Sequence, residues 1–178
     1  MDYQEKMVLL KNGRTCLLRR GEEADAAMLV DYLKSTAGEP PYLMREPEEV
    51  QLTVEEERDL IREKNSEDRT LNLLAFVDGE HAGNCAFNPI SEHSRARHRC
   101  TVGIALYRKF WGMGIGTALL GEILDMPKSA GYEQAELEVV SANRPAAALY
   151  RKFGFETTGT MPRVIKYGDG TYADFLFM

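Results

Sequence analysis

Residues 100–126 read CTVGIALYRKFWGMGIGTALLGEILDM, and this stretch decides the fold. In its first part, residues 100–106, larger apolar side chains alternate with small or polar ones, as in a strand with one strongly apolar face. In its last part, residues 115–126, apolar side chains recur at helical spacing. Three glycines lie between the two parts: Gly112, Gly114 and Gly116. The stretch therefore predicts a strand, a glycine-rich turn and a helix.

Upstream of this stretch the sequence predicts three more strands. Residues 71–77 and 82–88 are apolar segments joined by Asp78-Gly79, a dipeptide that tolerates the positive φ angles of a tight hairpin turn. We expect them to pair as antiparallel strands. Residues 15–19 are apolar enough for the first strand of the chain.

Two helices are expected between the first strand and this hairpin. Residues 26–38 carry apolar side chains at the spacing of one helix face. Thr53 with Glu56 three positions later forms a capping box, which predicts the start of a charged helix that ends near Lys64.

Downstream, Pro127 is expected to end the helix of the central stretch, and residues 135–139 alternate as the next strand. A short helix is predicted from about Pro145 to Phe153. Residues 164–167 and 172–178 are expected to form a closing hairpin. The resulting order, βααβββαβαββ, predicts an α+β fold with a mixed sheet.

Composition and net charge argue against several classes of protein. The 178 residues are 44% hydrophobic and 28% charged, as expected for one globular domain. The net charge of -6 argues against a nucleic-acid partner. The lack of a long apolar segment or a signal-peptide pattern predicts a cytoplasmic protein with no membrane partner. Neither the histidines nor the cysteines have metal-binding spacing, so we expect no metal and three buried thiols: Cys16, Cys85 and Cys100.

The glycine turn is the first candidate for function. Backbone N–H groups in such a turn, at the start of a helix, can approach a phosphate closely. The cluster lacks the lysine of a P-loop, and Leu119 stands where the dinucleotide-binding fingerprint requires its third glycine. Glu136 does lie where a ribose-binding acid is expected, so a nucleotide-binding domain remains an alternative from the turn alone.

The turn and a second segment together resemble a known family. The stretch Trp111–Leu120, WGMGIGTALL, is similar to the acyl-CoA pyrophosphate loop of the GNAT superfamily of N-acetyltransferases. The stretch Leu137–Phe155, LEVVSANRPAAALYRKFGF, is similar to the second signature of that family. The resemblance extends from about Leu71 to the end of the chain. One departure is Trp111, since the family often has Arg or Gln at that position.

The resemblance implies a mixed, mostly antiparallel central sheet of six or seven strands with flanking helices, and acetyl-CoA as co-substrate. It implies that the backbone of residues 104–106 pairs with the pantetheine arm, that the amides of residues 112–117 hold the pyrophosphate, and that Asn143 meets the cofactor where two strands splay. The cofactor-binding residues so implied are Ile104, Leu106, Gly112, Met113, Gly114, Ile115, Gly116, Thr117 and Asn143. Four basic residues either meet the 3′-phosphate of coenzyme A or are solvated surface residues: Arg108, Lys109, Arg151 and Lys152.

Acetyl transfer from a thioester to an amine needs a neutral amine, stabilisation of the oxyanion and a proton for the thiolate. The resemblance implies Tyr150 as the acid at the sulfur, and its spacing from Asn143 is expected to put both near one end of the short helix. It implies Glu138 as the general base, with Glu136 on the same strand face and a chain of water molecules as alternatives. A backbone N–H of residues 104–106 is expected to meet the oxyanion.

The expected partner is an amine-bearing acceptor, either a small molecule or a peptide or protein. Residues 39–57 contain seven glutamates, which either form an acidic rim that attracts an amine or are simply solvated. A non-catalytic acyl-CoA-binding or sensing module is the alternative function, and whether two copies form a homodimer is left open. We expect residues 1–178 to be a single N-acetyltransferase domain with three parts: acceptor-shaping helices over about 22–64, an acyl-CoA-binding core over about 71–155 and a C-terminal hairpin over about 157–178.

Overall fold

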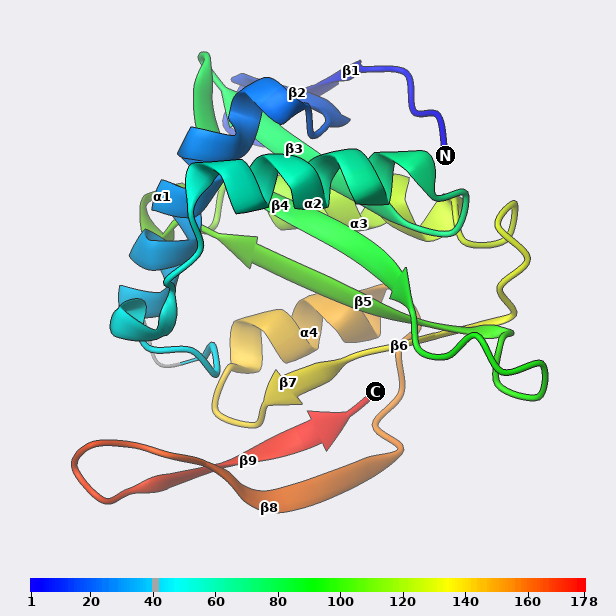
Figure 1. Ribbon diagram of the computed structural model, residues 1–178. Coiled ribbons are helices and arrows are strands. Elements are labelled where there is room, and N and C mark those ends of the chain that lie inside the picture. The colour runs from blue at the N-terminus through cyan, green and yellow to red at the C-terminus, as the bar shows by residue number, and fades with distance from the viewer. Residues whose placement is uncertain (40–41) are drawn as a thin grey trace.

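The computed structural model describes residues 1–39 and 42–178, and its centre is a six-stranded sheet with the order β1-β2-β3-β4-β5-β6 (Figure 1). All neighbouring strands in this sheet are antiparallel except β5 and β6, which are parallel. Its strands are β1 (Lys6–Leu9), β2 (Thr15–Arg20), β3 (Leu71–Val77), β4 (Glu80–Pro89), β5 (Arg99–Leu106) and β6 (Gln134–Glu136). The predicted α+β fold with a mixed, mostly antiparallel sheet is confirmed.

The helices cover both faces of this sheet, because side chains alternate along its strands. Leu73 and Val77 of β3 lie in the main core cluster with Leu119 of helix α3, whereas Leu74 packs with Leu29 of α1 and with α2 on the other face. The helices are α1 (Ala26–Gly38), α2 (Val54–Ser66), α3 (Ile115–Asp125) and α4 (Arg144–Lys152), with short 3-10 turns η1 (Glu23–Asp25), η2 (Pro47–Glu49) and η3 (Arg108–Phe110). None of the helices in the described part of the chain is long and apolar enough to cross a membrane.

Local sequence signals place several boundaries where they were predicted. Thr53 and Glu56 form the capping box of α2, with the Glu56 N–H donating to the Thr53 hydroxyl at 3.2 Å. Asp78 and Gly79 both have positive φ, 52° and 80°, and join β3 to β4 as a tight hairpin. The three cysteines are free and buried, as expected.

The strand predicted over residues 135–139 is wrong as a single strand. It is divided at Leu137 into β6, which belongs to the large sheet, and β7 (Glu138–Val140), which belongs to a second sheet with the order β7-β9-β8. Leu137 exchanges two backbone hydrogen bonds with Met178, so the chain changes strand partner at this residue. The other strands of the second sheet are β8 (Gly159–Lys166) and β9 (Tyr172–Phe177), and Figure 1 shows them below the main sheet.

Strand β1 was not predicted at all. Within the described residues it is an edge strand that pairs only with β2. Met7 and Leu9 are largely exposed, so the sequence lacks the alternation that a half-buried strand produces. Strand β8 also begins five residues before the predicted Val164, because a register shift between Met161 and Ile165 interrupts the alternation.

Candidate active site

Strands β5 and β7 diverge, and the candidate site lies in the opening between them. β5 pairs in parallel with β6 only over residues 99–101, and the next strand, β7, pairs with β9 instead. Among the described residues, the edge of β5 beyond Thr101 therefore has no strand partner on this side.

The backbone groups on that free edge can be identified from the ladder on the other side of β5. The Tyr107 N–H donates to the Ala82 carbonyl at 3.0 Å, and the Arg99 carbonyl accepts from the Ile90 N–H at 3.2 Å, so odd-numbered residues of β5 bond to β4. Because backbone groups alternate in direction along a strand, the N–H and C=O groups of Val102, Ile104 and Leu106 point into the opening. The opening thus offers hydrogen-bonding groups to an extended ligand.

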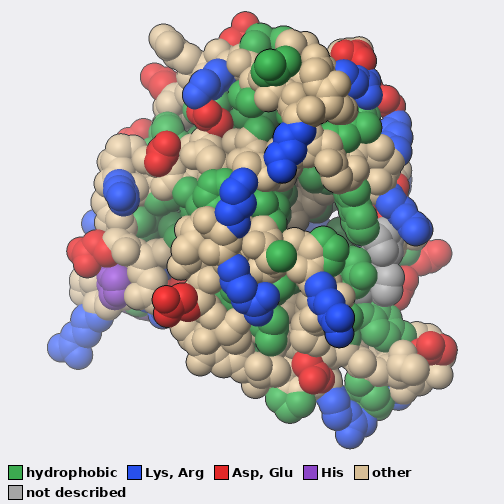
Figure 2. All heavy atoms as spheres, turned by 180° about the vertical axis from the view of Figure 1, so that it is seen from behind, with side chains coloured by type: hydrophobic (Ala, Val, Ile, Leu, Met, Phe, Trp, Pro, Cys, Tyr) green, Lys and Arg blue, Asp and Glu red, His purple; other side chains and the backbone are tan. Residues whose placement is uncertain are grey.

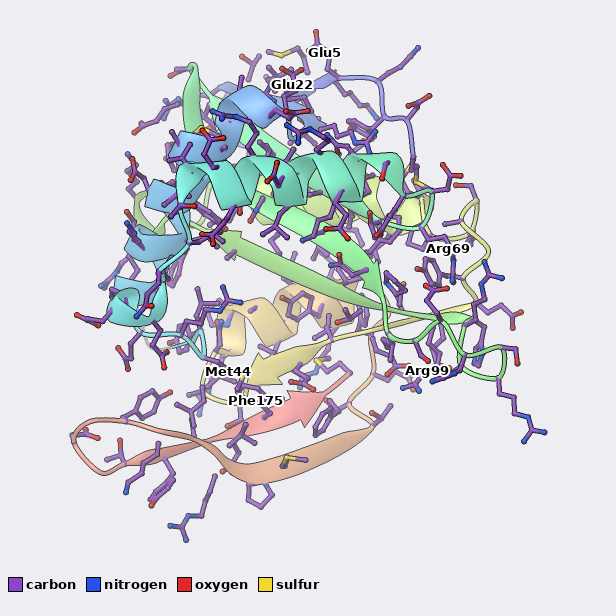
Figure 3. All side chains as sticks on the ribbon, in the orientation of Figure 1. Glu5, Glu22, Met44, Arg69, Arg99 and Phe175 are labelled. Carbon is purple, nitrogen blue, oxygen red and sulfur yellow. The ribbon has the colours of Figure 1, made fainter. Side chains whose placement is uncertain are left out.

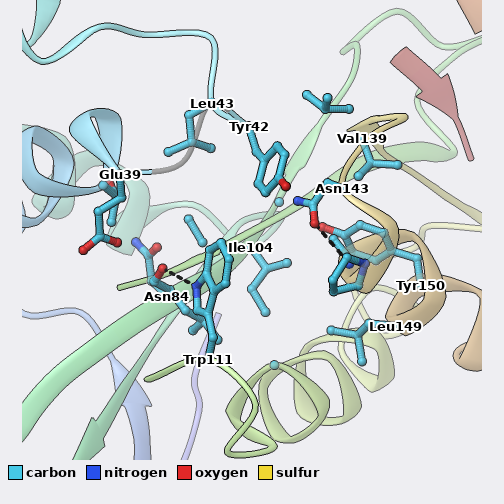
Figure 4. Close-up of a pocket in the computed structure, with 18 of the residues that line it drawn as sticks. Glu39, Tyr42, Leu43, Asn84, Ile104, Trp111, Val139, Asn143, Leu149 and Tyr150 are labelled. Atoms are coloured by element: carbon cyan, nitrogen blue, oxygen red, sulfur yellow. Dashed lines mark hydrogen bonds between the residues drawn. The ribbon is translucent and has the colours of Figure 1, made fainter. Parts of the chain in front are cut away.

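A cavity of about 760 Å³ fills this opening. Figure 4 shows Ile104, Trp111, Asn143 and Tyr150 around the same space. Three segments form most of its wall: β5 with the glycine turn, β7 with α4, and the link between α1 and α2. Of the residues predicted to bind the cofactor, those that line it are Ile104, Leu106, Gly112, Gly114, Gly116, Thr117 and Asn143.

The glycine turn has a conformation that side chains rarely adopt. Gly112 and Gly114 have φ angles of 77° and 92°, and Gly114 is the N-cap of α3. A Cβ on Gly116 would lie 3.0 Å from Leu149 of α4, so this glycine allows the two helices to approach. Bare amides at the start of α3 therefore face the cavity, where the positive end of the helix dipole favours an anion.

Two other residues predicted in this turn do not line the cavity. Ile115 is buried in the main core and Met113 packs against it. Their side chains serve packing, and only their backbone is available for the predicted role.

Asn143 and Tyr150 both line the cavity from α4. The expectation that both lie near one end of this helix is wrong. Asn143 is the N-cap, and its side-chain oxygen accepts from the Ala146 N–H at 3.3 Å. Tyr150 lies in the last turn, about two turns further along the same face. The seven-residue spacing places the two residues on one face rather than at one end.

Tyr150 is buried, and its ring packs edge-on against Phe155 with 5.9 Å between the ring centroids. Burial raises the pKa of the Tyr150 hydroxyl, and the nearby Cys85 thiol raises it further. The hydroxyl thus stays protonated at neutral pH. It is a neutral proton donor in the wall of the cavity.

The two candidate carboxylates have different surroundings because the strand that carries them is divided. Glu136 forms a bidentate ion pair with Arg99, which together with Gln134 holds the pKa of this carboxyl below its usual range. Glu136 does not line the cavity, and Figure 3 shows Arg99 far from Met44 and Phe175. Glu138 is exposed and lines the cavity, and no side-chain hydrogen bond or ion pair engages it within the described residues.

The link between α1 and α2 forms the opposite wall. Tyr42 packs on the cluster of Val140 and Phe175 and also stacks on Trp111, with ring centroids 6.4 Å apart and an interplanar angle of 17°. The link is thereby joined both to the C-terminal hairpin and to the glycine turn. Arg45 lines the cavity, and none of the ion pairs in residues 1–39 and 42–178 involves it.

The seven glutamates of residues 39–57 do not form an acidic rim on the cavity. Glu39 lines it, but this carboxylate accepts a hydrogen bond from the Arg108 N–H at 2.6 Å. Glu49 and Glu56 complete capping boxes, and Glu55 pairs with Arg58. These glutamates mostly serve helix ends and surface ion pairs, which the charge run alone could not reveal.

Several cavity residues were missed by the sequence analysis. Lys11 reaches the glycine turn from the β1–β2 hairpin, an element that was only half predicted. The Tyr32 hydroxyl lies within hydrogen-bonding distance of the Asn84 side-chain oxygen, at 2.6 Å, and of the Ala105 carbonyl, at 2.8 Å, which ties α1 to the sheet beside the cavity. Their positions depend on contacts between distant segments, for which the sequence has no local signal. No group of three or more residues of the types that bind metals comes together in the described part of the chain.

Comparisons with known proteins agree with this geometry. A family model described as the acetyltransferase (GNAT) family matches residues 33–155. The chain is 30% identical over 109 residues, or 60% of its length, to the L-amino acid N-acetyltransferase AaaT of Escherichia coli (strain K12), of which the match covers 65%. The chain spans less than two thirds of the length of the curated relatives it matches.

Solved structures show the same architecture. An acetyltransferase of the GNAT family from Streptococcus pneumoniae is similar with a TM-score of 0.86 and 29% identity, over 92% of this chain and 97% of that one. The structure of yncA from Salmonella typhimurium with its cofactor acetyl-CoA is similar in fold, with a TM-score of 0.80 and 18% identity, over 97% of this chain and 92% of that one.

Proposed function

The chain belongs to the acetyltransferase (GNAT) family, whose members transfer an acetyl group from acetyl-CoA to an amine, and we propose that it performs this transfer on the amine of a small acceptor that also carries a carboxylate. The observation that carries the proposal is the continuous cavity that joins the glycine turn, the free edge of β5 and Tyr150.

The residues of the cavity fit acetyl-CoA at two places. A Cβ on Gly112 would meet no atom within 4 Å, and one on Gly114 only the flexible side chain of Lys11, so the turn leaves space for a pyrophosphate against its amides. The backbone groups of Val102 and Ile104 and the N–H of Leu106 suit the amide groups of a pantetheine arm, which needs donors and acceptors at strand spacing. The Leu106 carbonyl is already engaged by the indole N–H of Trp111.

The position of each group in the cavity indicates its catalytic role. A backbone N–H on the free edge of β5 stabilises the negative charge that develops on the thioester oxygen. Tyr150, whose pKa is raised by burial, supplies a proton to the departing thiolate. Glu138 accepts a proton from the acceptor ammonium, directly or through water, because an alkyl ammonium with a pKa near ~10.4 is not nucleophilic at neutral pH. Glu136 is already engaged by Arg99, and we do not assign the base to it.

The chemical class of the acceptor is inferred from two charged residues that line the cavity away from the glycine turn, one in β7 and one in the link between α1 and α2. Glu138 and Arg45 are a carboxylate and a guanidinium without ion pairs among the described residues, and the link that carries Arg45 packs against the second sheet through Tyr42. A free guanidinium binds a carboxylate well because its N–H groups match both oxygens. The similarity to an L-amino acid N-acetyltransferase also supports an amino acid as the acceptor.

The experiment that tests the proposal is a thiol-release assay with acetyl-CoA and a panel of L-amino acids, the matching amines without a carboxylate, and peptides with free N-termini. Turnover of amino acids at much higher kcat/KM than their matching amines is expected. Faster turnover of the peptides would move the acceptor to a protein terminus. Binding of acetyl-CoA without turnover of any acceptor would instead favour the alternative, an acyl-CoA-binding module.

A further inference from the structure

Lys11 lies on the turn between β1 and β2, and this turn is well fixed. The Leu10 N–H donates to the Arg14 carbonyl at 2.8 Å and the Gly13 N–H donates to the Leu10 carbonyl at 3.0 Å. Leu10 is buried in the main core. The backbone that carries Lys11 is thus held by these two hydrogen bonds and by the burial of Leu10.

The N-terminal hairpin also contacts helix α3. Lys6 forms an ion pair with Glu122 at 2.6 Å, and the Tyr3 hydroxyl donates to the same carboxylate at 3.3 Å. At the start of α3, the Cγ and Cδ atoms of Lys11 lie 3.6 and 3.9 Å from where a Cβ of Gly114 would be. The ammonium group is only two bonds beyond Cδ, and Lys11 and Gly114 line the same cavity.

Lys11 differs from the basic residues around it, because it has no anionic partner among residues 1–39 and 42–178. Lys6 and Arg14 of the same hairpin are paired, and Lys109 beside the turn is paired with Glu80. Lys11 lines the cavity, is exposed and takes part in none of the ion pairs within the described residues. Figure 2 shows several Lys and Arg side chains on the face opposite that of Figure 1.

The glycine turn itself contributes no cation to the cavity. Trp111, the residue that precedes Gly112, donates its indole N–H to the Leu106 carbonyl at 3.0 Å and stacks on Tyr42. Among the described residues that line the cavity, the one other cation is Arg45, which belongs to the link between α1 and α2. A ligand with a dianionic pyrophosphate at the turn therefore meets Lys11 as its nearest available counter-charge in the cavity wall.

We propose that Lys11 is a binding residue for the pyrophosphate of coenzyme A, supplied to the glycine turn by the N-terminal hairpin. This inference rests on the proposed function. It assigns a role to the β1–β2 hairpin, which lies before the residues 33–155 that match the family model.

The test is calorimetric titration of three ligands into wild type, Lys11→Gln, Lys11→Arg and Arg14→Gln. The ligands are CoA, dephospho-CoA, which lacks the 3′-phosphate, and pantetheine, which lacks all phosphates. Arg14→Gln is the matched control, because it removes a cation from the same turn that already has a partner.

For Lys11→Gln we expect the Kd of CoA and of dephospho-CoA to rise equally, by about 3- to 30-fold at low salt, and the difference to shrink as salt is added. The Kd of pantetheine is expected to stay unchanged, Lys11→Arg to retain most of the affinity, and Arg14→Gln to bind like wild type.

An unchanged Kd for CoA in Lys11→Gln would overturn the inference while leaving the proposed function intact. A loss with CoA but not with dephospho-CoA would overturn the pyrophosphate assignment in favour of the 3′-phosphate. Absence of CoA binding in wild type would contradict the proposed function, and this inference with it.

Discussion

The indole N–H of Trp111 donates to the backbone carbonyl of Leu106 across 3.0 Å, so the residue before the first glycine of the turn is fixed to the last residue of β5. This bond joins the two parts of the proposed cofactor site, the free strand edge and the glycine turn. It also holds the indole in the position where the ring stacks on Tyr42 of the link between α1 and α2.

Trp111→Phe is therefore expected to weaken CoA binding by about 3- to 10-fold, because it removes one hydrogen bond but keeps an aromatic ring against Tyr42. Calorimetry gives the affinity, and far-UV circular dichroism checks the fold. CoA affinity equal to that of wild type would show that the bond does not position the turn.

Tyr150→Phe is expected to lower kcat by roughly 10- to 10⁴-fold with little change in CoA affinity, because the ring still packs on Phe155 while the proton donor is lost. Steady-state kinetics with calorimetry on the same preparations separates the two effects. Wild-type turnover in this variant would leave Tyr150 with a packing role only.

Glu138→Gln is expected to reduce kcat/KM by about 10- to 100-fold near pH 7 and progressively less as the pH rises towards the pKa of the acceptor amine, where no base is needed. The measurement is the pH profile of kcat/KM for both proteins. A reduction of the same size at every pH would indicate a binding or structural role.

Glu136→Gln is the matched control, since it removes a carboxylate two residues away that is paired with Arg99. We expect its pH profile to follow that of wild type. If Glu136→Gln alone shows the defect at low pH, the base assignment is wrong.

The protonation of His81 is expected to make the stability of the fold depend on pH. Its ring is buried among Tyr32, Phe76 and Tyr107, and both ring nitrogens lack a well-formed hydrogen bond within the described residues. Desolvation lowers the pKa of His81 from 6.5 to about 4; Arg19 lowers it too, while Asp25 and a weak contact with the Gly83 backbone oppose the shift.

Because the folded-state pKa lies below the unfolded one, the unfolded chain binds the proton first as the pH falls. The contribution of His81 is fully present above pH 6.5 and is lost between pH 6.5 and about 4. Urea unfolding should show that His81→Leu loses less stability than wild type over this range, by up to about 3 kcal/mol. Parallel pH dependence in the two proteins would contradict the assignment.

Features that depend on residues close together in the chain could be predicted from the sequence. The glycine turn, the capping box at Thr53 and the turn at Asp78-Gly79 are of this kind. Features that depend on distant partners were missed or wrong. Residues 135–139 alternate as one strand, but the pairing of Leu137 with Met178 divides them between two sheets.

The candidate site shows the same division. Asn143 and Tyr150 were predicted as site residues from the resemblance, and both line the cavity. Their expected position near one end of the helix was wrong, because the seven-residue spacing separates them by about two turns along one face of α4. The choice between Glu136 and Glu138 could not be made from alternation, because it depends on Arg99, which lies 37 positions before Glu136 in the chain. Lys11 and Arg45 reach the cavity from an edge hairpin and from an irregular link, and neither segment has a periodicity that predicts where its side chains lie.

The central claim is that coenzyme A binds against the glycine turn at the start of α3, and calorimetric titration of CoA into Gly114→Val and Gly131→Val tests it most directly. Both glycines have left-handed φ angles, 92° and 80°, so both substitutions strain the backbone, but only Gly114 lines the cavity. The account predicts that Gly131→Val binds CoA like wild type and that Gly114→Val does not bind it measurably. Equal CoA affinity in the two variants would contradict it.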